Sequence, residues 1–258
     1  MTLPPPDQAL RICVVVPARN EEELIGSCLR ALAEQEGVSC EEYEVLLVLD
    51  GCTDGTEARA KEVAASYPSL QLHLLDGPGK GSGHARRVGM EAACDRLYAV
   101  GRPHALISST DADTVVAPDW ISAQLDAAER GARAIGGRIE LGDDGTVPEA
   151  LLEWHLARGY SRHRKLLSEP VPSGKTEHWQ FSGASMTLTA AVYREVGGLE
   201  PGEALEDEQL EDALRRHGVP IERLLSVRVV TSARLVGRAG QGLAHDLSAA
   251  ARYLNVVN

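Results

Sequence analysis

The sequence predicts an α/β fold built on a Rossmann-like, mostly parallel sheet with helices on both faces. Short apolar runs occur at 12–16, which is rich in β-branched residues, and at 45–49; a less regular run at 70–75 follows, and a fourth run, 105–107, precedes two aspartates. Such runs are typical of strands that are buried on both faces. Helical patterns separate them, and strands that alternate with helices form parallel sheets through right-handed crossovers.

The first half of the chain contains three strand–helix units and a fourth strand. We expect Pro17 to end the first strand and Asn20, with Glu23 three residues later, to cap the helix that follows. A turn-rich segment at 50–56 leads into a helix over 57–67, and a glycine-rich segment at 77–83 leads into a helix over 84–97. The fourth strand ends at Asp111-Ala112-Asp113.

The second half of the chain alternates less regularly. The expected elements are helices over 118–130, 149–167, 190–196 and 206–217, strands over 134–141, 181–188, 221–224 and 227–231, and a terminal helix within 235–258. The strand over 181–188 should be entered through a tight glycine turn. A chain of 258 residues is long enough to form one large α/β domain, which is what we expect.

The composition narrows the function classes. There are 38 Asp and Glu residues against 26 Lys and Arg, a formal charge of −12, which argues against general binding to nucleic acid or to an anionic membrane. The five cysteines show no C-x-x-C spacing, which indicates reduced thiols rather than disulfides or structural zinc. No apolar run approaches the length of a transmembrane segment, so we expect a soluble, cytoplasmic protein.

Four loops that follow strands should meet at one edge of the sheet: 17–21, 50–54, 80–83 and 111–113. Open α/β sheets bind ligands at the carboxyl ends of their strands. In extended backbone Asp111 and Asp113 would point to the same side, where they could hold one hard divalent cation. Taken alone, the two aspartates fit a turn or a helix cap equally well. The convergence of the loops favours the metal site.

Other phosphate chemistries fit the sequence less well. The glycine-rich segment lacks the Gly-Lys-Ser/Thr sequence of a Walker loop, and a dinucleotide fingerprint would follow the first strand rather than the third. A flexible surface loop is the alternative, although Lys80 suits a diphosphate, and Arg86 and Arg87 add positive charge. Asp111 and Asp113 also suit a haloacid-dehalogenase-type phosphatase, but that motif ordinarily lies on the first strand of its domain.

Six short segments, taken together and in order, resemble motifs of the family 2 glycosyltransferases, GT-A-fold enzymes that use nucleotide-diphospho-sugars. They are 15–22 (VVPARNEE), 49–56 (LDGCTDGT), Lys80-Gly81 with Ala85-Arg86, Asp111-Ala112-Asp113, 181–184 (FSGA) and 205–208 (LEDE). The resemblance covers about residues 11–240. It implies a single GT-A domain over 1–258, with a nucleotide-sugar-binding half at about 11–115, an acceptor-side half at about 116–240 and a C-terminal tail at 241–258.

The resemblance also implies the roles of individual residues. Donor binding falls to Pro17, Ala18, Arg19, Glu21, Asp50, Lys80, Gly81, Arg86, Asp111, Ala112, Asp113 and Gly183. Mg²⁺ or Mn²⁺ would be held by Asp113 and Asp111, and His245 lies where some related enzymes have a downstream histidine ligand. Asp207, beside Glu206, is the expected catalytic base, although an acidic run also suits a helix N-terminus.

We therefore expect a metal-dependent, inverting transfer of a single sugar, from a UDP-type donor to an unknown small-molecule, lipid or glycan acceptor. Leu49 and Arg87 depart from the common motifs, and the Gln-x-x-Arg-Trp motif of processive synthases is absent from the sequence. Retention of configuration stays open, because retaining relatives share the fold and the metal motif. A sugar nucleotidyltransferase and a non-catalytic nucleotide-sugar-binding protein stay open as well.

Further basic and aromatic residues have two interpretations each. The run Arg158, Arg162, His163, Arg164 and Lys165 would receive an anionic acceptor or form a solvated helix face. Arg234 and Arg238 would reach the donor diphosphate or remain ordinary surface arginines. Trp154 and Trp179 would stack on a sugar or pack in the core.

Overall fold

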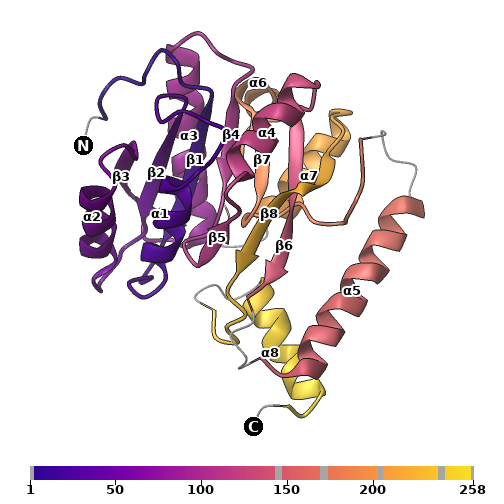
Figure 1. Ribbon diagram of the computed structural model, residues 1–258. Coiled ribbons are helices and arrows are strands. Elements are labelled where there is room, and N and C mark those ends of the chain that lie inside the picture. The colour runs from indigo at the N-terminus through magenta and orange to yellow at the C-terminus, as the bar shows by residue number, and fades with distance from the viewer. Residues whose placement is uncertain are drawn as a thin grey trace.

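One eight-stranded sheet, ordered β3-β2-β1-β4-β7-β6-β8-β5, runs through the computed structural model, and helices cover both of its faces (Figure 1). The structure describes residues 3–142, 147–168, 174–200, 202, 206–237 and 242–256. The strands are β1 (Ile12–Ala18), β2 (Tyr43–Leu49), β3 (Leu72–Asp76), β4 (Leu106–Ser109), β5 (Thr114–Val116), β6 (Ala134–Leu141), β7 (Met186–Thr189) and β8 (Glu222–Thr231). The helices are α1 (Ile25–Ala33), α2 (Thr56–Ser66), α3 (Ser82–Ala99), α4 (Trp120–Glu129), α5 (Glu149–Ser168), α6 (Ala190–Glu195), α7 (Glu206–Arg216) and α8 (Leu243–Tyr253).

The sheet is parallel in the first half of the chain and mixed in the second. β3, β2, β1 and β4 pair in parallel. β7 then pairs antiparallel with both β4 and β6, whereas β6 and β8 are parallel. The α/β fold with a mostly parallel sheet is therefore confirmed. The carboxyl ends of β1, β2 and β4 lie at one edge, as their loops require.

Two apolar layers hold the helices to the sheet. Alternate residues of β1 point to opposite faces, so that Val14 and Val16 pack with α1, α2 and α4, whereas Cys13 and Val15 pack with α3, α6 and α7. All seven residues of β1 are buried. Burial on both faces explains why this strand is a continuous apolar run rather than an alternating one.

Two expectations for the first loop are wrong. Pro17 lies inside β1 and pairs with Val48 of β2; the β1–β4 pairing already ends at Val15, so the missing N–H of Pro17 breaks no bond on that side. Asn20 caps no helix, because α1 begins at Ile25. It adopts a left-handed conformation with φ of 54°, and its side-chain oxygen accepts a hydrogen bond from the Thr53 amide at 2.8 Å.

In the second half the expected helices and the strand over 134–141 are confirmed within a few residues. The strand expected over 181–188 is shorter, because a turn in which the Ser185 amide donates to the Ser182 carbonyl precedes β7, which starts at Met186. Two further differences lie at the sheet edge. The two closing strands are one strand, β8, whose pairing with β6 shifts register between Gly137 and Arg138. A β-bulge therefore replaces the expected break. The short strand β5, which starts at Thr114 directly after the aspartate pair, was not expected, because three residues carry too little periodicity to be recognised.

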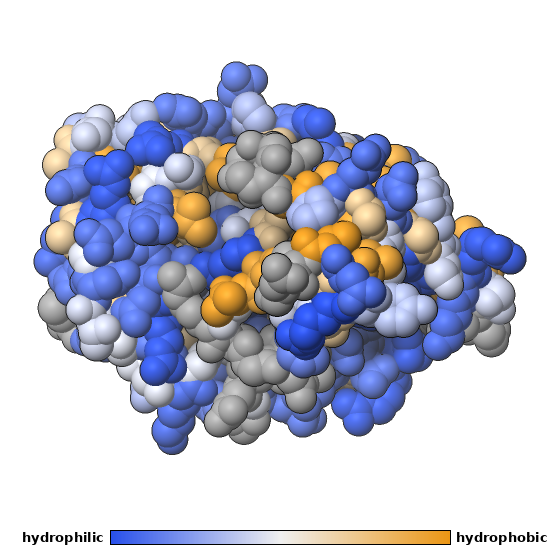
Figure 2. Space-filling view, turned by 90° about the horizontal axis from the view of Figure 1, so that it is seen from below, coloured by the Kyte–Doolittle hydropathy of each residue, from blue (hydrophilic) through white to orange (hydrophobic). Residues whose placement is uncertain are grey.

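α5 and α8 form an arm at the lower edge of the molecule (Figure 1). Of the described side chains of α5, Leu151 alone is fully buried, and it packs against Leu247, Ala250 and Ala251 of α8. Figure 2 shows the molecule from below, with apolar side chains gathered near the middle of this face among polar ones. Within the described residues, no helix is both long and apolar enough to span a bilayer.

Candidate functional site

A cleft of about 1060 Å³ lies at the carboxyl edge of the parallel strands. Its wall brings together most of the predicted site residues: Pro17, Ala18, Arg19, Glu21, Asp50, Gly81, Arg86, Asp111, Ala112, Asp113, Gly183, Glu206, Asp207 and His245. The loops after β1, β2, β3 and β4 supply one side, and α5, the start of α7 and the segment after β8 supply the other. Lys80 differs from the rest, since its side chain is exposed on the glycine loop.

Asp50 organises the loop after β3. Its side chain is buried, and its two carboxylate oxygens accept hydrogen bonds from the amides of Gly79 and Gly81 at 2.6 and 2.8 Å. A carboxylate that accepts two backbone N–H bonds fixes the loop without a side-chain partner. Asp50 also lines the cleft, so this residue, expected to bind the donor, positions the glycine loop in this structure.

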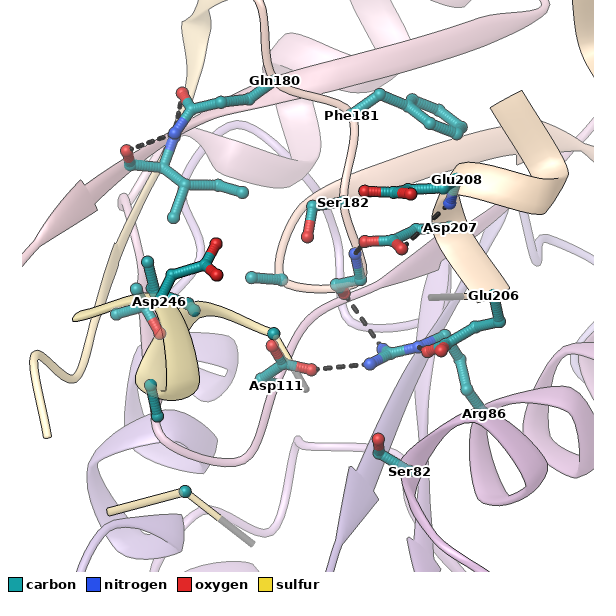
Figure 3. A pocket seen from close by; sticks show the side chains of 18 of the residues that line it. Ser82, Arg86, Asp111, Gln180, Phe181, Ser182, Glu206, Asp207, Glu208 and Asp246 are labelled. Carbon is teal, nitrogen blue, oxygen red and sulfur yellow. Dashed lines mark hydrogen bonds and ion pairs between the residues drawn. The ribbon is translucent and has the colours of Figure 1, made fainter. Parts of the chain in front are cut away.

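Arg86 of α3 joins the two acidic motifs. Its guanidinium donates to Asp111 at 2.8 Å and to Glu206 at 2.9 Å (Figure 3). It also donates to the Ser109 hydroxyl at 2.5 Å and to the Gly183 carbonyl at 3.0 Å. The two carboxylates raise the pKa of Arg86 against the opposing effect of burial. The positive charge expected to act on the donor is thus used within the protein, as the centre of a buried network.

The turn at 182–185 approaches this network closely. A Cβ atom added to Gly183 would collide with the Arg86 guanidinium, so a residue without a side chain is needed at this position. The Gly183 amide donates to the Asp207 carboxylate at 3.3 Å. The glycine turn therefore connects Arg86 with the start of α7.

The aspartate pair adopts a turn rather than the expected extended strand end, since the Thr114 amide donates to the Asp111 carbonyl at 3.1 Å. The two carboxylates still influence each other: burial and the nearby Asp111 charge raise the pKa of Asp113, and Arg234 opposes this shift. An Arg234 nitrogen lies 2.8 Å from the Asp113 carboxylate, and the same guanidinium binds both carboxylate oxygens of Glu21 at 2.8 and 2.9 Å.

The side chains near the aspartate pair supply some of the ligands that a divalent cation needs. Asp111 and Asp113 offer hard oxygen ligands, which Mg²⁺ and Mn²⁺ favour. Among the residues that the structure describes, no three His, Cys, Asp or Glu side chains gather closely enough to hold a metal ion. His245 lines the cleft but is 57% exposed and lies beside Asp246, so it is not brought to the aspartate pair. Two carboxylates leave coordination positions that diphosphate and water oxygens can fill.

The two predicted catalytic acids occupy different environments. Glu206 is buried and paired with Arg86, which leaves its carboxylate committed to an ion pair. Asp207 is only partly buried, lines the cleft and accepts hydrogen bonds from the amides of Gly183 and Glu208 (Figure 3). The geometry therefore favours Asp207 over Glu206 for proton transfer. Leu205 of the motif 205–208 and Arg238, the second arginine considered for the diphosphate, lie outside the described residues.

Two ion pairs of the cleft join residues that lie far apart in the sequence. The contact of Arg234 with Glu21 joins residues that are 213 positions apart, and the link from Arg86 to Glu206 spans 120 positions. No local pattern reports such a pairing; an arginine next to a predicted acidic loop is the one signal that could have suggested it.

Comparisons with known proteins were made by sequence and by structure. The family model described as glycosyl transferase family 2 matches residues 13–185. Glycosyltransferase AglE of Haloferax volcanii is 28% identical over 130 residues, which cover 50% of this chain and 39% of that protein. Polyprenol monophosphomannose synthase of Mycolicibacterium smegmatis is 34% identical over 139 residues, covering 53% of this chain and 48% of that protein. The chain thus spans about half or less of the length of these relatives.

Solved structures share the fold at low sequence identity. A mannosyltransferase from Pyrobaculum calidifontis, PcManGT in complex with GDP-Man and Mn²⁺, aligns with a TM-score of 0.62 at 19% identity over 91% of this chain and 60% of that one. TarS 1-349 of S. aureus in complex with UDP aligns with a TM-score of 0.62 at 17% identity over 95% and 71%. Because the family model matches well over half of the residues, this chain, with its GT-A-like fold, belongs to glycosyl transferase family 2, as its motifs indicated.

Proposed function

We propose that this protein is a metal-dependent glycosyltransferase that moves one sugar from a UDP-type nucleotide-diphospho-sugar to an acceptor hydroxyl with inversion. The observation that carries the proposal is that Asp111, Asp113 and Asp207 line one cleft, in which the buried Arg86 binds both Asp111 and Glu206, the neighbour of Asp207. Family membership supports the reaction class. Structural neighbours in complex with GDP-Man and with UDP support a nucleotide-linked donor.

The donor would lie across the loops after β1, β2 and β3, on the half formed by about residues 11–115. The loop around Pro17, Ala18 and Arg19 and the residue Asp50 would hold the nucleoside. Gly81, at the start of α3, would bring backbone amides and the positive end of the helix dipole near the diphosphate. When the donor binds, Arg234 would leave Asp113 and bind the diphosphate instead. Its positive charge would then balance the negative charge of the diphosphate in an acidic cleft.

Charge develops on the leaving diphosphate as the bond to the sugar breaks. A Mg²⁺ or Mn²⁺ ion on Asp113 and Asp111 would neutralise that charge as a Lewis acid. Asp207 would accept the proton of the acceptor hydroxyl while the hydroxyl oxygen attacks the anomeric carbon from the opposite face. Arg86 and Gly183 would fix the position of Asp207 relative to the aspartate pair. Arg86 donates to the Gly183 carbonyl, and the Gly183 amide donates to the Asp207 carboxylate.

A thermal-shift panel tests the donor half of this proposal. UDP- and GDP-sugars are added to the protein with and without Mn²⁺, since a ligand that binds only the folded state raises the melting temperature. We expect a UDP-sugar to give the largest shift and to need Mn²⁺ for it. Asp113→Asn should remove the Mn²⁺-dependent part, whereas Asp126→Asn on the outer face of α4 should keep it. Absence of a metal-dependent shift with every nucleotide would refute the proposal.

A further inference from the structure

The helix α5 presents a row of cations to the acceptor side of the cleft. Arg158, Arg162 and Lys165 line the cleft, and their spacing of four and three residues places them on one face of the helix. Arg164 lies between them in sequence, is exposed, and points along a different face. The basic run predicted from sequence is therefore divided into a part that faces the cleft and a part that does not.

Trp179 holds the middle cation of this row. The Arg162 guanidinium stacks over the Trp179 ring with 4.5 Å to its centroid. The ring lies close to the α5 backbone at Gly159, where an added Cβ would be 3.0 Å from the indole nitrogen. A stacked guanidinium loses rotational freedom but keeps its N–H edge for hydrogen bonding. Arg162 is thus oriented before any ligand binds.

Within the described residues, the charges on this face are balanced only in part. Arg158 pairs with Asp246 at 2.6 Å. In the described part of the chain, neither Arg162 nor Lys165 forms an ion pair with a carboxylate. Partial loss of hydration and the charge of Arg158 lower the pKa of Arg162, and Asp246 and Glu208 offset this only in part. Arg162 lines the same cleft as Asp207 and Glu208 at the start of α7.

We propose that Arg162 and Lys165 form a subsite for a phosphate group carried by the acceptor substrate. The inference rests on the proposed function, because the subsite shares its cleft with Asp207. A phosphate monoester carries about −1.5 to −2 charges at pH 7, which matches these two cations, without carboxylate partners among the described residues, better than a single carboxylate would. The arginine fork supplies directed hydrogen bonds and the lysine supplies a mobile point charge.

Such a phosphate can come from a water-soluble molecule or from a lipid. Three large side chains of α5, Leu156, Tyr160 and Leu167, are 53%, 71% and 62% exposed and recur at helical spacing. They form an uncovered stripe on the face of α5 opposite to the basic row, and none of the three lines the cleft. Either source would place its phosphate on Arg162 and Lys165, and the stripe on the opposite face of the helix takes no part in the subsite.

Binding measurements without donor test the subsite. Glycerol 1-phosphate is titrated into the wild-type chain, with glycerol as the matched neutral probe, and phosphatidylcholine vesicles with and without phosphatidic acid form the lipid arm. We expect Arg162→Gln and Lys165→Gln each to weaken phosphate binding about tenfold, the loss of one charge-assisted contact. Arg164→Gln, the same charge change on another face, should stay within about twofold.

The outcomes separate the subsite from the proposed function. Equal weakening by Arg164→Gln, or no weakening by Arg162→Gln and Lys165→Gln, would overturn the subsite, because binding would then follow overall charge. Selective weakening supports it, with the soluble source assigned if glycerol 1-phosphate suffices and the lipid source if only phosphatidic acid vesicles bind. The Mn²⁺-dependent rise in melting temperature with a UDP-sugar, measured on the same samples, should be equal in all variants. If wild type lacks that rise, the proposed function fails, while the phosphate-binding comparison still decides the subsite.

Discussion

The donor side of the cleft and the α5 arm hold their charges in different ways. On the donor side each acidic motif has an internal partner: Asp111 and Glu206 share Arg86, and Asp113 and Glu21 share Arg234. On α5 the cations Arg162 and Lys165 face the cleft without such partners in the described residues. The first region is organised before ligands bind, and the second offers charge to a ligand.

The largest expected effect comes from breaking the donor-side network. Arg86→Ala would leave the buried Glu206 carboxylate without its cation, which typically costs about 3–5 kcal/mol. Urea denaturation should show this loss in the free energy of unfolding. Arg87→Ala, one residue away on the exposed pair with Glu91, should cost less than about 1 kcal/mol. Equal costs for both arginines would mean that the network adds no stability.

A second buried pair in the same half predicts a pH dependence. Burial by itself would raise the pKa of Glu44, but hydrogen bonds from Arg96 and His73 outweigh it and lower the pKa from 4.5 to about 2. Because the folded state binds this proton more weakly than the unfolded chain, the stabilisation, on the order of 3 kcal/mol, is present above pH 4.5 and is lost as the pH falls towards 2.

Urea titrations of wild type and Glu44→Gln between pH 7 and pH 2.5 check this dependence. The variant should be less stable at pH 7, and the difference should shrink as the pH falls below 4.5. Glu57→Gln, at an exposed pair with Lys61, is the matched control and should follow wild type throughout. A constant difference across the range would contradict the assignment.

The arm should respond locally rather than globally. Leu151→Ala removes the buried contact of α5 with α8. It should lower the stability of this contact region by about 2–3 kcal/mol, as expected for a cavity that relaxes in part. Hydrogen exchange should then accelerate in both helices but not in β1 or β2. Leu156→Ala, at an exposed position of the same helix, should leave exchange unchanged. Faster exchange throughout the sheet would show that the arm and the sheet unfold together.

The sequence predicts the strands better than it predicts the conformations of the loops. The strands of the parallel half and the convergence of the loops could be predicted, because apolar runs and parallel topology fix them without knowledge of long-range contacts. The conformation of the loops could not. Asn20 looks like a helix cap in sequence, yet the Thr53 amide, 33 residues away, takes its side-chain oxygen. A tertiary partner replaced the local one.

Charged residues show a second limit. The motifs located Arg86 and Asp113 in the site, but their partners Glu206 and Arg234 come from distant segments, and only the folded chain decides which charges neutralise each other. Likewise, the basic run on α5 was recognised, but the helix phase and Trp179 decide that Arg162 faces the cleft and Arg164 does not. Sequence therefore predicted which residues meet more reliably than how they pair.

The most direct test of the central claim is the release of nucleoside diphosphate from a UDP-sugar by the Asp207→Asn variant, with the Mn²⁺-dependent thermal shift measured on the same samples. If Asp207 is the base of a preformed donor site, turnover should fall about 10²–10⁴-fold while the shift stays within error of wild type. Asp126→Asn should match wild type in both. Turnover within a few-fold of wild type, or loss of the shift together with turnover, would contradict the claim.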